Sequence, residues 1–364
     1  MAVRVALVIH ALYGGGAERL MSRLAGRWSD RHSVHLVTWA NTDSDRYSVP
    51  PAVTRHGLGL MGDSPNWVAG VWANLRRVRR LRNKLQEVRP DAVISFTDQV
   101  NIVTLQATSG WSAPVWIAEH SDPRQQRLRP AWERWRNRVY PRAAGCIVLT
   151  ESIAEYARRW LPAERIRVIP AAVDDLPQGV RTSVEAHPPR FLFVGRLSAE
   201  KRVDRLIAAW QRIAPRLEQW RLTVVGDGPL RAQLEAAAAE VPRVEFLGWH
   251  DAPEQVYREG GVLVLPSQYE GFPVALLEGM LHGLPAIATQ CTDAVQTLAG
   301  SGDALVVVPQ DVDALAQAMC DLANDPCRRA VVAERGSAVA SKYQWQHVGP
   351  LWDAVLDQSA SLNR

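Results

Sequence analysis

Short apolar runs alternate with amphipathic segments along the first half of the chain. The run from Val3 to His10 is followed at once by a glycine-rich turn and a helical pattern, and this succession recurs several times before residue 170. Alternating strand and helix patterns predict a parallel sheet that is covered by helices on both faces. In this half we predict strands at VRVALVIH, SVHLVT, AVTRHGL, DAVISF, PVWIAEH, GCIVLT and IRVIP.

The segment from Pro170 to Arg190 interrupts this alternation. It is rich in proline, glycine and polar residues and has no apolar periodicity, which predicts a linker. The alternation then begins again, so we predict two doubly wound α/β domains in tandem. The predicted parts are an N-terminal domain (1–172), a linker (173–190), a C-terminal domain (191–342) and a C-terminal helix (343–364). The second half holds predicted strands at RFLFVG, RLTVVG, VEFLGW, GVLVLPS, PAIAT and ALVVV and helices at 204–216, 230–240, 253–259, 273–282, 312–324 and 327–341.

Composition predicts a soluble globular protein. Apolar residues make up 47% and charged residues 22%, and no apolar run approaches the roughly 18 residues of a membrane span. A signal peptide is the alternative for the first apolar run, but the turn and helix pattern behind it favour a buried strand. The four cysteines show no CxxC spacing and no cluster of His and Cys is visible, so we expect reduced thiols and no metal site.

Charge is divided unevenly between the two halves of the chain. Residues 1–180 carry 25 Lys and Arg against 16 Asp and Glu, a net charge of +9, whereas residues 181–364 carry 17 against 22, a net charge of −5. A basic half favours phosphates, an anionic membrane surface or nucleic acid as partners. No DNA- or RNA-binding motif accompanies the charge, so we expect no nucleic-acid partner.

Glycine-rich turns or paired cations follow three of the predicted strands. In GGGAER, Gly14 to Arg19, successive glycines let backbone amides approach an anion, and the helix start adds partial positive charge. A plain tight turn is the alternative, both here and for VVGDGPL, which contains Gly226. VGRLSAEKRVDRL is more specific, because Arg196 and Lys201 directly follow a strand, where two cations can neutralise a diphosphate. A solvated basic loop is the alternative for that segment.

Two carboxylates flank a predicted helix start in the stretch EGFPVALLE. Glu270 lies in the loop after a buried strand, and Glu278 lies one to two turns into the helix behind it. Carboxylates repel phosphate but accept hydrogen bonds from hydroxyl groups. Together with Arg196 and Lys201 they suit a nucleotide-sugar, which carries a diphosphate between a ribose and a hexose. Two surface glutamates would be the simpler interpretation if those cations were absent.

As a set, these segments resemble the retaining GT-B glycosyltransferases of family four. PSQYEGFPVALLEGMLHGLP, Pro266 to Pro285, is similar to the family's E-x7-E signature, and GGGAER, GRLSAEKRVDRLI and GDGPLRAQLE are similar to its other motifs in the same order. ISFTDQVNI, IAEHSDPR and ATQC resemble the subgroup that builds lipid-linked oligosaccharides and exopolysaccharide units. The resemblance implies a GT-B fold, with two Rossmann-like domains facing a central cleft and a C-terminal helix that crosses back to the N-terminal, acceptor-binding domain.

The resemblance also implies a role for each motif. Arg196 and Lys201 would bind the diphosphate and stabilise the leaving group, and Glu270 would accept hydrogen bonds from the donor hexose. Glu278 would hold the ribose hydroxyls. His120, at the end of a predicted strand, would line the acceptor side near the anomeric carbon, although a histidine in that place is often structural. The catalytic set is thus His120, Arg196, Lys201 and Glu270, and the other donor-binding residues are Gly15, Gly16, Gly226, Gly271, Phe272 and Val274.

The chain departs from the family pattern after ATQC. Relatives often carry Gly-Gly and then a Glu there, whereas this chain has Thr292, Asp293 and, at the Glu position, Gln296. That region contacts the phosphates or the sugar in the family, so the departure bears on the identity of the donor. LEGM replaces the usual LEAM, a small change that should leave Glu278 in place.

Two basic stretches indicate contact with a membrane surface. Residues 66–88 form an amphipathic helical pattern whose apolar stripe we expect to pack mostly in the core, with arginines on the other faces. The stretch 124–142 combines seven arginines with two tryptophans. Basic amphipathic helices with interfacial tryptophan suit an anionic bilayer surface, and a solvated helix face is the alternative. The residues predicted to contact the membrane or the acceptor are Arg76, Arg77, Arg80, Trp132 and Trp135.

These observations predict a retaining glycosyltransferase in the cytoplasm, peripherally associated with the inner face of the membrane. A hexose or N-acetylhexosamine would pass from a nucleotide-diphosphate sugar, with UDP preferred by the subgroup resemblance, to a lipid-diphosphate-linked or polysaccharide acceptor. We expect no cofactor and no metal, because cationic side chains would neutralise the leaving group. The DSD stretch, Asp43 to Asp45, is interpreted as surface away from the other motifs. The alternatives are a sugar-nucleotide epimerase of the same architecture and a non-enzymatic, basic membrane or nucleic-acid binding module.

Overall fold

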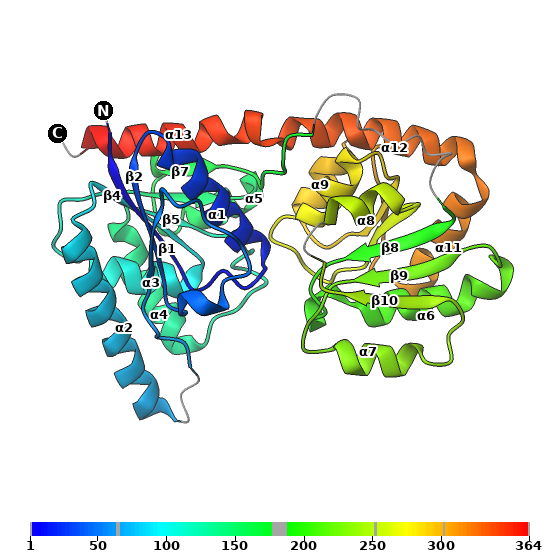
Figure 1. Ribbon diagram of the computed structural model, residues 1–364, viewed down its shortest axis with the longest axis horizontal. Coiled ribbons are helices and arrows are strands. Elements are labelled where there is room, and N and C mark those ends of the chain that lie inside the picture. Colours follow the sequence, from blue (N-terminus) through cyan, green and yellow to red (C-terminus); the bar gives the residue numbers. More distant parts are fainter. Residues whose placement is uncertain (1, 63–65, 177–187, 251–252, 301–302, 363–364) are drawn as a thin grey trace. The chain divides into compact units, whose positions relative to one another are not determined.

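The chain forms two compact units in the computed structural model, which describes residues 2–62, 66–176, 188–250, 253–300 and 303–362 (Figure 1). Unit 1 comprises Met1–Pro170 with Gly349–Arg364, and unit 2 comprises Ala171–Val348. Most of the predicted linker, 177–187, lies outside the described residues. Its described first residues belong to unit 2, where Val173 bridges to Gln344.

Unit 1 is built on a seven-stranded parallel sheet. Its strand order is β3-β2-β1-β4-β5-β6-β7, so that β1 pairs with β2 on one side and with β4 on the other. All seven strands predicted for this half are confirmed. They are β1 Arg4–Ile9, β2 Ser33–Thr38, β3 Thr54–Gly57, β4 Ala92–Phe96, β5 Val115–Ala118, β6 Gly145–Val148 and β7 Ile166–Val168.

Helices pack against the unit 1 sheet and against each other (Figure 1). The strands nearest the middle are apolar at nearly every position, as expected for a sheet covered on both faces. Trp28, Phe96 and Trp116 are among the largest fully buried side chains. The helices are α1 Gly16–Ser29, α2 Trp67–Val88, α3 Asp98–Ala107, α4 Pro130–Val139 and α5 Glu151–Ala157, with 3-10 turns at Thr42–Ser44, Tyr140–Arg142 and Ala163–Arg165.

Helix α2 corrects one prediction, because its apolar stripe is only half buried. Leu81, Leu85 and Val88 lie in the core, whereas Trp72 is 69% exposed and Leu75 is 55% exposed. Val68 and Val71 are exposed as well. A helix of 22 residues is about 33 Å long, and Figure 1 shows its first turns reaching beyond the other elements of unit 1. The N-terminal turns therefore have no layer to pack against.

Unit 2 repeats the architecture with a six-stranded parallel sheet. Its order is β10-β9-β8-β11-β12-β13, and all six strands predicted for this half are confirmed. They are β8 Arg190–Val194, β9 Arg221–Val225, β10 Val244–Gly248, β11 Val262–Leu265, β12 Ala286–Thr289 and β13 Val306–Val308. One apolar core packs alternate residues of these strands against the helices that flank that face, with Trp210, Phe191 and Phe193 fully buried.

The helices of unit 2 follow the predicted segments, with one addition. Helix α10 was not predicted, and it follows β12 in the region where the chain departs from the family pattern. Its seven residues are too few to show a helical period in the sequence. The helices are α6 Val203–Ile213, α7 Arg231–Ala238, α8 Pro253–Glu259, α9 Val274–Leu281, α10 Asp293–Ala299, α11 Val312–Asn324 and α12 Pro326–Ala340, with 3-10 turns at Ala199–Lys201, Ala214–Arg216 and Ser341–Tyr343.

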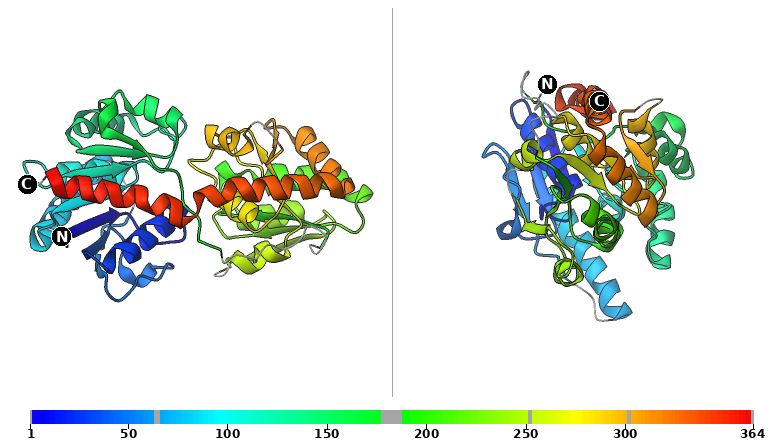
Figure 2. Two further views of the ribbon diagram at one scale, coloured as in Figure 1. Left: turned by 90° about the horizontal axis from the view of Figure 1, so that it is seen from above. Right: turned by 90° about the vertical axis from the view of Figure 1, so that its right-hand side faces the viewer.

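The last helix, α13 Trp345–Leu362, returns to unit 1 as predicted. Its residues from Gly349 onward lie across the elements of unit 1, where Figure 2 shows the helix in red. The Asp353 carboxylate accepts hydrogen bonds from Arg27 Nη2 at 2.6 Å and from Trp28 Nε1 at 2.9 Å. Trp352 is fully buried, and its ring centroid lies 5.4 Å from that of Phe96.

None of the helices that the structure describes is both long enough and apolar enough to span a membrane.

Candidate functional site

The predicted cations and carboxylates of unit 2 follow the two strands between which the strand order reverses. Strands β8 and β11 are neighbours in the sheet, although β9 and β10 separate them in the sequence. Arg196 and Lys201 follow β8, and Glu270 and Glu278 follow β11. Loops that leave two such strands diverge and leave a crevice at their carboxyl ends, where open α/β sheets bind ligands. The topology therefore brings the four predicted residues to one edge of one sheet.

Lys201 and Glu270 are in direct contact. The Lys201 ammonium donates to Glu270 Oε1 at 2.6 Å, and the Ser267 hydroxyl donates to the same oxygen at 2.7 Å. The Glu270 side chain is buried and that of Lys201 is mostly buried. A buried charge requires a partner. Here the Lys201 ammonium and the Glu270 carboxylate are partners of each other. The pair places one cation and one acceptor side by side.

Ser267, which orients Glu270, was not among the predicted site residues. It lies two residues after β11. Its carbonyl oxygen accepts a hydrogen bond from Thr289 Oγ1 at 2.6 Å. Thr289 belongs to the neighbouring strand β12. A serine three residues before a glutamate is the only signal in the sequence, and it is too common to be selective.

Glu278 is held by a second residue that the sequence did not indicate. The Tyr257 hydroxyl donates to Glu278 Oε2 at 2.8 Å, and both side chains are buried. Tyr257 comes from α8, whereas Glu278 comes from α9. The hydrogen bond fixes the carboxylate on the inner face of its helix, so Glu278 is not a surface glutamate.

Glycines after β8 and β9 let two loops pass in backbone contact. A Cβ at Gly226 would lie 1.8 Å from the carbonyl oxygen of Gly195, and the Gly226 φ of 135° is itself unfavourable for other residues. A Cβ at Gly228 would lie 2.4 Å from the carbonyl oxygen of Leu197. The glycines of GDGPL thus position the loop that carries Arg196, whose side chain is exposed. The structure shows this packing role for Gly226, and a donor contact remains a prediction.

The turn before α9 contains the other predicted donor residues. Phe272 is almost fully buried, and its ring centroid lies 5.6 Å from that of Tyr343. The Val274 amide donates to the Phe272 carbonyl oxygen at 3.0 Å, while Gly271 is partly exposed. The amide of Val274 is therefore already used inside the turn.

Cys291, at the end of ATQC, lies close to the Lys201–Glu270 pair. Burial, reinforced by the Glu270 carboxylate and opposed by Lys201, raises the pKa of the Cys291 thiol to about 12. A thiol with this pKa stays protonated at neutral pH and is a poor nucleophile. Cys291 therefore contributes bulk and a weak donor to this edge.

The glycine-rich turn of unit 1 already binds a carboxylate of the chain. The amides of Gly14 and Gly15 donate to Glu18 Oε2 at 2.6 and 2.9 Å, and Glu18 Oε1 lies 2.9 Å from His10 Nε2. Burial would raise the pKa of Glu18, but the hydrogen bonds from His10 and Gly15 outweigh it and lower that pKa. The turn thus has the anion-binding geometry expected of it, and Glu18 occupies that position.

The strand order of unit 1 reverses between β1 and β4, and a strained residue lies there. Thr97, directly after β4, has a φ of 74°. A β-branched residue with positive φ is a genuine outlier, and such strain is concentrated at functional sites. Its amide donates to Ala118 of β5, and its carbonyl oxygen accepts from Asn101. These hydrogen bonds fix the backbone conformation of Thr97 at the carboxyl edge of the unit 1 sheet.

His120 lies two residues after β5, and its ring packs at a tilt against Phe96, with 4.2 Å between ring centroids. Its Nε2 atom is buried and has no hydrogen-bond partner among the described residues. Burial lowers the pKa of His120 to about 3, so the imidazole is neutral at physiological pH. A neutral imidazole with an unsatisfied nitrogen can form a hydrogen bond with a hydroxyl group. Its predicted acceptor-side role remains a prediction.

Glu119, next to His120, is a buried acid that the sequence did not single out. Its Oε1 accepts from the Tyr140 hydroxyl. Burial, together with the Asp98 carboxylate, raises the pKa of Glu119 to about 8. The side chain is therefore a neutral carboxylic acid at pH 7.

The residues predicted for membrane contact have different environments. Arg76 and Arg80 are exposed on α2, while Arg77 is half-buried and donates to the carbonyl oxygens of Leu60 and Gly62, each at 3.3 Å. Arg77 therefore positions the chain before α2. Trp132 and Trp135 on α4 stack on each other with 5.1 Å between centroids and are partly exposed.

No group of three or more His, Cys, Asp or Glu side chains suited to a metal ion occurs among the residues that the structure describes.

Comparisons with known protein families cover most of the chain. Residues 15–172 match the family model described as "Glycosyl transferase 4-like domain", and residues 188–325 match "Glycosyl transferases group 1". One relative is the GalNAc-alpha-(1->4)-GalNAc-alpha-(1->3)-diNAcBac-PP-undecaprenol alpha-1,4-N-acetyl-D-galactosaminyltransferase of Campylobacter jejuni, 26% identical over 96% of this chain and 97% of the relative. Another is an exopolysaccharide phosphotransferase of Streptomyces coelicolor, 27% identical over 84% of this chain and 33% of the relative.

Two solved structures share the fold of this chain. Sucrose-phosphate synthase from Thermosynechococcus elongatus has a TM-score of 0.82 at 20% identity, covering 98% of both chains. Anabaena Alr3699/HepE in complex with UDP and glucose has a TM-score of 0.77 at 19% identity, covering 98% of this chain and 99% of that one. These likenesses confirm the predicted fold, and the family matches favour a transferase over the epimerase and the binding module.

Proposed function

Because this chain is a glycosyltransferase of the GT-B fold, we propose that it transfers a hexose or N-acetylhexosamine from a UDP-sugar to a lipid-linked or polysaccharide acceptor, with retention of the anomeric configuration. The observation that carries this proposal is the contact between Lys201 and Glu270 at the strand-order reversal of unit 2. The contact places a cation that can bind a diphosphate at hydrogen-bond distance from a carboxylate that can accept from sugar hydroxyls.

The relatives support the substrate classes. The Campylobacter relative is named for an undecaprenol-diphosphate-linked glycan acceptor, and the Streptomyces relative is named for exopolysaccharide. Structures with the same fold were determined with UDP, and one of them also with glucose. On this basis we include a lipid-linked acceptor and a UDP-sugar donor in the proposal for this chain.

Charge placement accounts for the chemistry. When the bond between the sugar and the diphosphate breaks, negative charge develops on the leaving oxygen, and fixed cations nearby lower the energy of the transition state. We assign this stabilisation of the leaving diphosphate to Lys201 and Arg196. The Arg196 side chain is exposed and can approach the diphosphate from the solvent side of its loop. Glu270 accepts from hexose hydroxyls and Glu278 from ribose hydroxyls. The acceptor hydroxyl attacks from the side of the leaving phosphate, which takes its proton, so the configuration is retained.

Unit 1 contributes the acceptor side in this proposal. His120 offers a neutral imidazole to a hydroxyl near the anomeric carbon, consistent with its buried, unpartnered Nε2. The predicted contact of Gly15 and Gly16 with the diphosphate carries less weight, because the Gly15 amide is already bonded to Glu18. The cations of unit 2 therefore supply the main share of diphosphate binding.

Stabilisation by a nucleotide-sugar tests the proposal. A ligand that binds only the folded protein at 100 times its Kd stabilises it by about 2.7 kcal/mol. In a thermal-shift panel of UDP-, GDP- and ADP-sugars, we expect UDP-sugars to raise the unfolding temperature of the wild type most. Glu270→Ala should lose most of this shift, and Glu240→Ala, an exposed change in the same unit, should keep it. A flat response to all three nucleotides would contradict the proposal.

We further propose that unit 1 contacts an anionic membrane surface, at the inner face of the membrane. The exposed apolar residues at the start of α2 lie on one side of a helix that also exposes Arg76 and Arg80. Apolar side chains beside cations are the combination that binds an anionic bilayer from its surface. Trp132 and Trp135 provide a second aromatic contact of the same kind.

Vesicle binding tests the membrane proposal. The protein should sediment with vesicles of phosphatidylcholine and phosphatidylglycerol, and less with phosphatidylcholine alone. The double change Trp72→Ala and Leu75→Ala should weaken partitioning roughly tenfold or more, because each large apolar side chain contributes about 1.5–3 kcal/mol when fully buried. Val331→Ala, an exposed apolar change in unit 2, is the matched control. Equal sedimentation of the double variant and the wild type would rule out this surface.

A further inference from the structure

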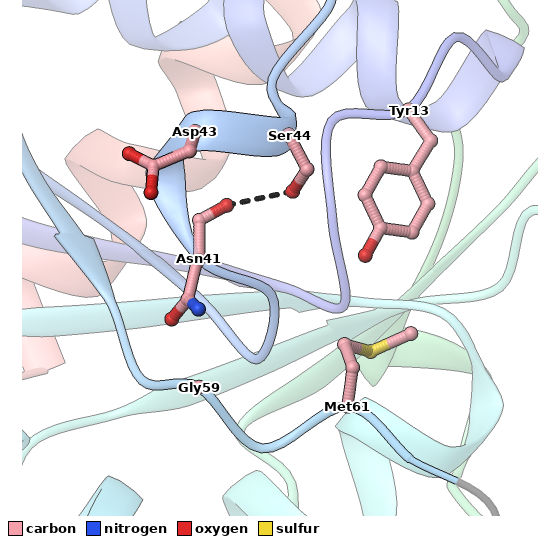
Figure 3. Close-up of a pocket in the computed structure, with 6 residues that line it drawn as sticks. All are labelled: Tyr13, Asn41, Asp43, Ser44, Gly59 and Met61. Carbon is pink, nitrogen blue, oxygen red and sulfur yellow. Dashed lines mark hydrogen bonds between the residues drawn. The ribbon is translucent and has the colours of Figure 1, made fainter.

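A pocket of unit 1 lies outside the residues assigned so far. Its volume is about 380 Å³, and its lining residues are Tyr13, Asn41, Asp43, Ser44, Gly59 and Met61 (Figure 3). Asp43 of the DSD stretch is exposed, as predicted, but it shares this pocket with Tyr13, next to the glycine-rich turn, so it does not lie away from the other motifs. Figure 3 shows the Asp43 side chain pointing away from Tyr13 and Met61. Among the described lining residues no charged group is thus directed at the apolar ones, and the carboxyl edge of unit 2 holds the more specific arrangement.

The loop that carries Glu270 is held by side chains from three other parts of unit 2. The carbonyl oxygens of residues 266–268 each accept a hydrogen bond from one of them. The donors are Arg205 of α6 to Pro266 at 3.0 Å, Thr289 of β12 to Ser267 at 2.6 Å, and Gln310, two residues after β13, to Gln268 at 2.8 Å. The backbone that places the Glu270 carboxylate is therefore fixed at three consecutive residues.

Gln310 connects two neighbouring segments of this carboxyl edge. Its Nε2 atom donates to the Gln268 carbonyl oxygen and, at 3.1 Å, to that of Gln290, which directly follows β12. The amide nitrogen of a glutamine side chain carries two hydrogens, so each carbonyl oxygen accepts one of them. We call these two hydrogen bonds the Gln310 clamp. The clamp ties the segment after β11 to the segment after β12.

Gln268 extends this connection to the turn that carries Lys201. Its amide donates to the Glu200 carbonyl oxygen at 2.7 Å, and Glu200 directly precedes Lys201. Lys201 and Glu270 are thus carried by two segments that are joined at Gln268. Through this residue and Gln310, the segments that follow β8, β11, β12 and β13 form one hydrogen-bonded network.

The exposure of Gln310 separates this network from core packing. Truncation of an exposed side chain leaves no cavity, and water can bond to both carbonyl oxygens, so the clamp should contribute little to the stability of the fold. Water cannot hold the two segments at a fixed distance, however. Arg205 and Thr289 are buried, and their removal would disturb the fold itself. Gln310 is therefore the member of the network whose role can be tested apart from folding.

Fixed positions matter wherever a protein stabilises charge in a reaction. Groups that are held in place beforehand need no reorganisation as charge develops, and a displacement of about 1 Å by a change far from the reacting atoms can lower a rate about 100-fold. The Lys201 ammonium and Glu270 Oε1 lie 2.6 Å apart, on the two segments that the network joins. Loss of the clamp should therefore affect the reaction assigned to these two side chains.

We propose that Gln310 is a positioning residue of the donor site. Its amide holds the Glu270 loop against the segment after β12 and, through Gln268, keeps that loop in place beside the Lys201 turn. The proposal rests on the proposed transferase function, in which Lys201 and Glu270 act on the nucleotide-sugar. Gln310 touches no substrate in this role and acts through backbone carbonyl groups.

Hydrogen exchange of the full chain without ligand, followed by mass spectrometry, tests the clamp directly. Gln310→Ala removes both hydrogen bonds, and Gln310→Glu keeps the shape of the side chain but replaces the donor by an acceptor. In both variants the amides of residues 267–272 should exchange several-fold faster than in the wild type, because local opening becomes easier. Gln310→Lys retains N–H donors and should restore the protection. The unfolding temperature of all three variants should stay close to that of the wild type.

Kinetics with a UDP-sugar and a lipid-linked acceptor test the consequence for the reaction. Gln310→Ala and Gln310→Glu should lower kcat at saturating donor roughly tenfold. The KM for the donor should change less, because Gln310 makes no contact with the donor in this role. Gln310→Lys should recover most of the lost kcat. The matched control is Gln317→Ala: Gln317 is exposed in the same unit and donates to Asp321 at 2.7 Å, and its removal should leave both exchange and kcat as in the wild type.

The outcomes separate this proposal from the proposed function. Unchanged exchange of residues 267–272 in Gln310→Ala and Gln310→Glu would overturn the clamp, and faster exchange at wild-type kcat would overturn its role in the reaction. A Gln310→Lys variant as impaired as Gln310→Ala would also contradict the proposal, since N–H donors are what the clamp requires. If the wild type transfers no sugar and no nucleotide-sugar stabilises it, while exchange still depends on Gln310, the proposed function fails and the clamp alone stands.

Discussion

Lys201→Ala is expected to lower kcat for sugar transfer roughly 100- to 1,000-fold, the usual effect of removing one group that stabilises transition-state charge. The ammonium lies 2.6 Å from Glu270 Oε1 at the strand-order reversal of unit 2. Without it, the leaving diphosphate keeps Arg196 as its remaining predicted cation. Transfer from a UDP-sugar to a lipid-linked acceptor, measured at saturating donor, checks the prediction.

Lys342→Ala is the matched control for this experiment. Lys342 is exposed in the same unit, and its removal takes away the same charge and the same side chain. It should keep wild-type kcat within about twofold. If Lys201→Ala also kept wild-type turnover, the assignment of the leaving-group cation would be wrong.

Stability has to be measured alongside activity, because the Lys201–Glu270 pair is largely buried. Removing one partner leaves the other with an unmatched charge, which costs about 3–5 kcal/mol in a fully buried pair. Glu270→Gln retains an oxygen that can accept from Ser267 and is the milder partner change. A loss of transfer in Glu270→Gln at unchanged unfolding temperature would show that the carboxylate acts in the reaction and not only in folding.

Trp352→Ala is expected to destabilise unit 1 by about 3–5 kcal/mol, the range for removing a buried large aromatic side chain. Trp352 is fully buried, and its ring packs against Phe96. Its removal leaves a cavity where α13 meets the sheet of unit 1, because the remaining contact of Asp353 with Arg27 and Trp28 fills none of that volume. Chemical denaturation, read as the midpoint and slope of the transition, measures the change.

Leu351→Ala provides the control one residue away on the same helix. Leu351 is exposed, so its removal should change the free energy of unfolding by less than about 0.5 kcal/mol. Equal midpoints for the two variants would mean that α13 does not contribute to the unit 1 core. Because Phe96 also packs against His120, Trp352→Ala should in addition loosen the predicted acceptor side.

Local pattern was sufficient for the strands and for most helices. Short runs bounded by turns predicted all thirteen strands of the two sheets. Most of them are apolar, because a strand covered on both faces needs apolar residues at nearly every position, whereas the edge strands β3 and β10 are partly exposed. The sequence also indicated Arg196, Lys201, Glu270 and Glu278 as one set, since each follows a strand at its carboxyl end. Helix α10 was not predicted, because its seven residues are too few to show a helical period.

Partners that come from distant elements could not be read from the sequence. Glu270 is oriented by Ser267, and Ser267 by Thr289 on another strand, while Glu278 depends on Tyr257 of α8. None of these pairs has a spacing that differs from chance. Likewise, only the tertiary structure showed that the Glu18 carboxylate accepts hydrogen bonds from the amides of the glycine turn.

The sequence by itself determined which segments become strands, where cations and carboxylates follow them, and that the chain has two α/β domains. The tertiary structure decided which strands are neighbours, and so placed Lys201 against Glu270, 69 positions apart in the sequence, and brought Asp43 and Tyr13 to the lining of one pocket. It also left the first turns of α2 exposed, although their apolar spacing matches that of the buried turns. Periodicity depends on local backbone geometry, whereas burial and contact depend on what the rest of the chain places alongside.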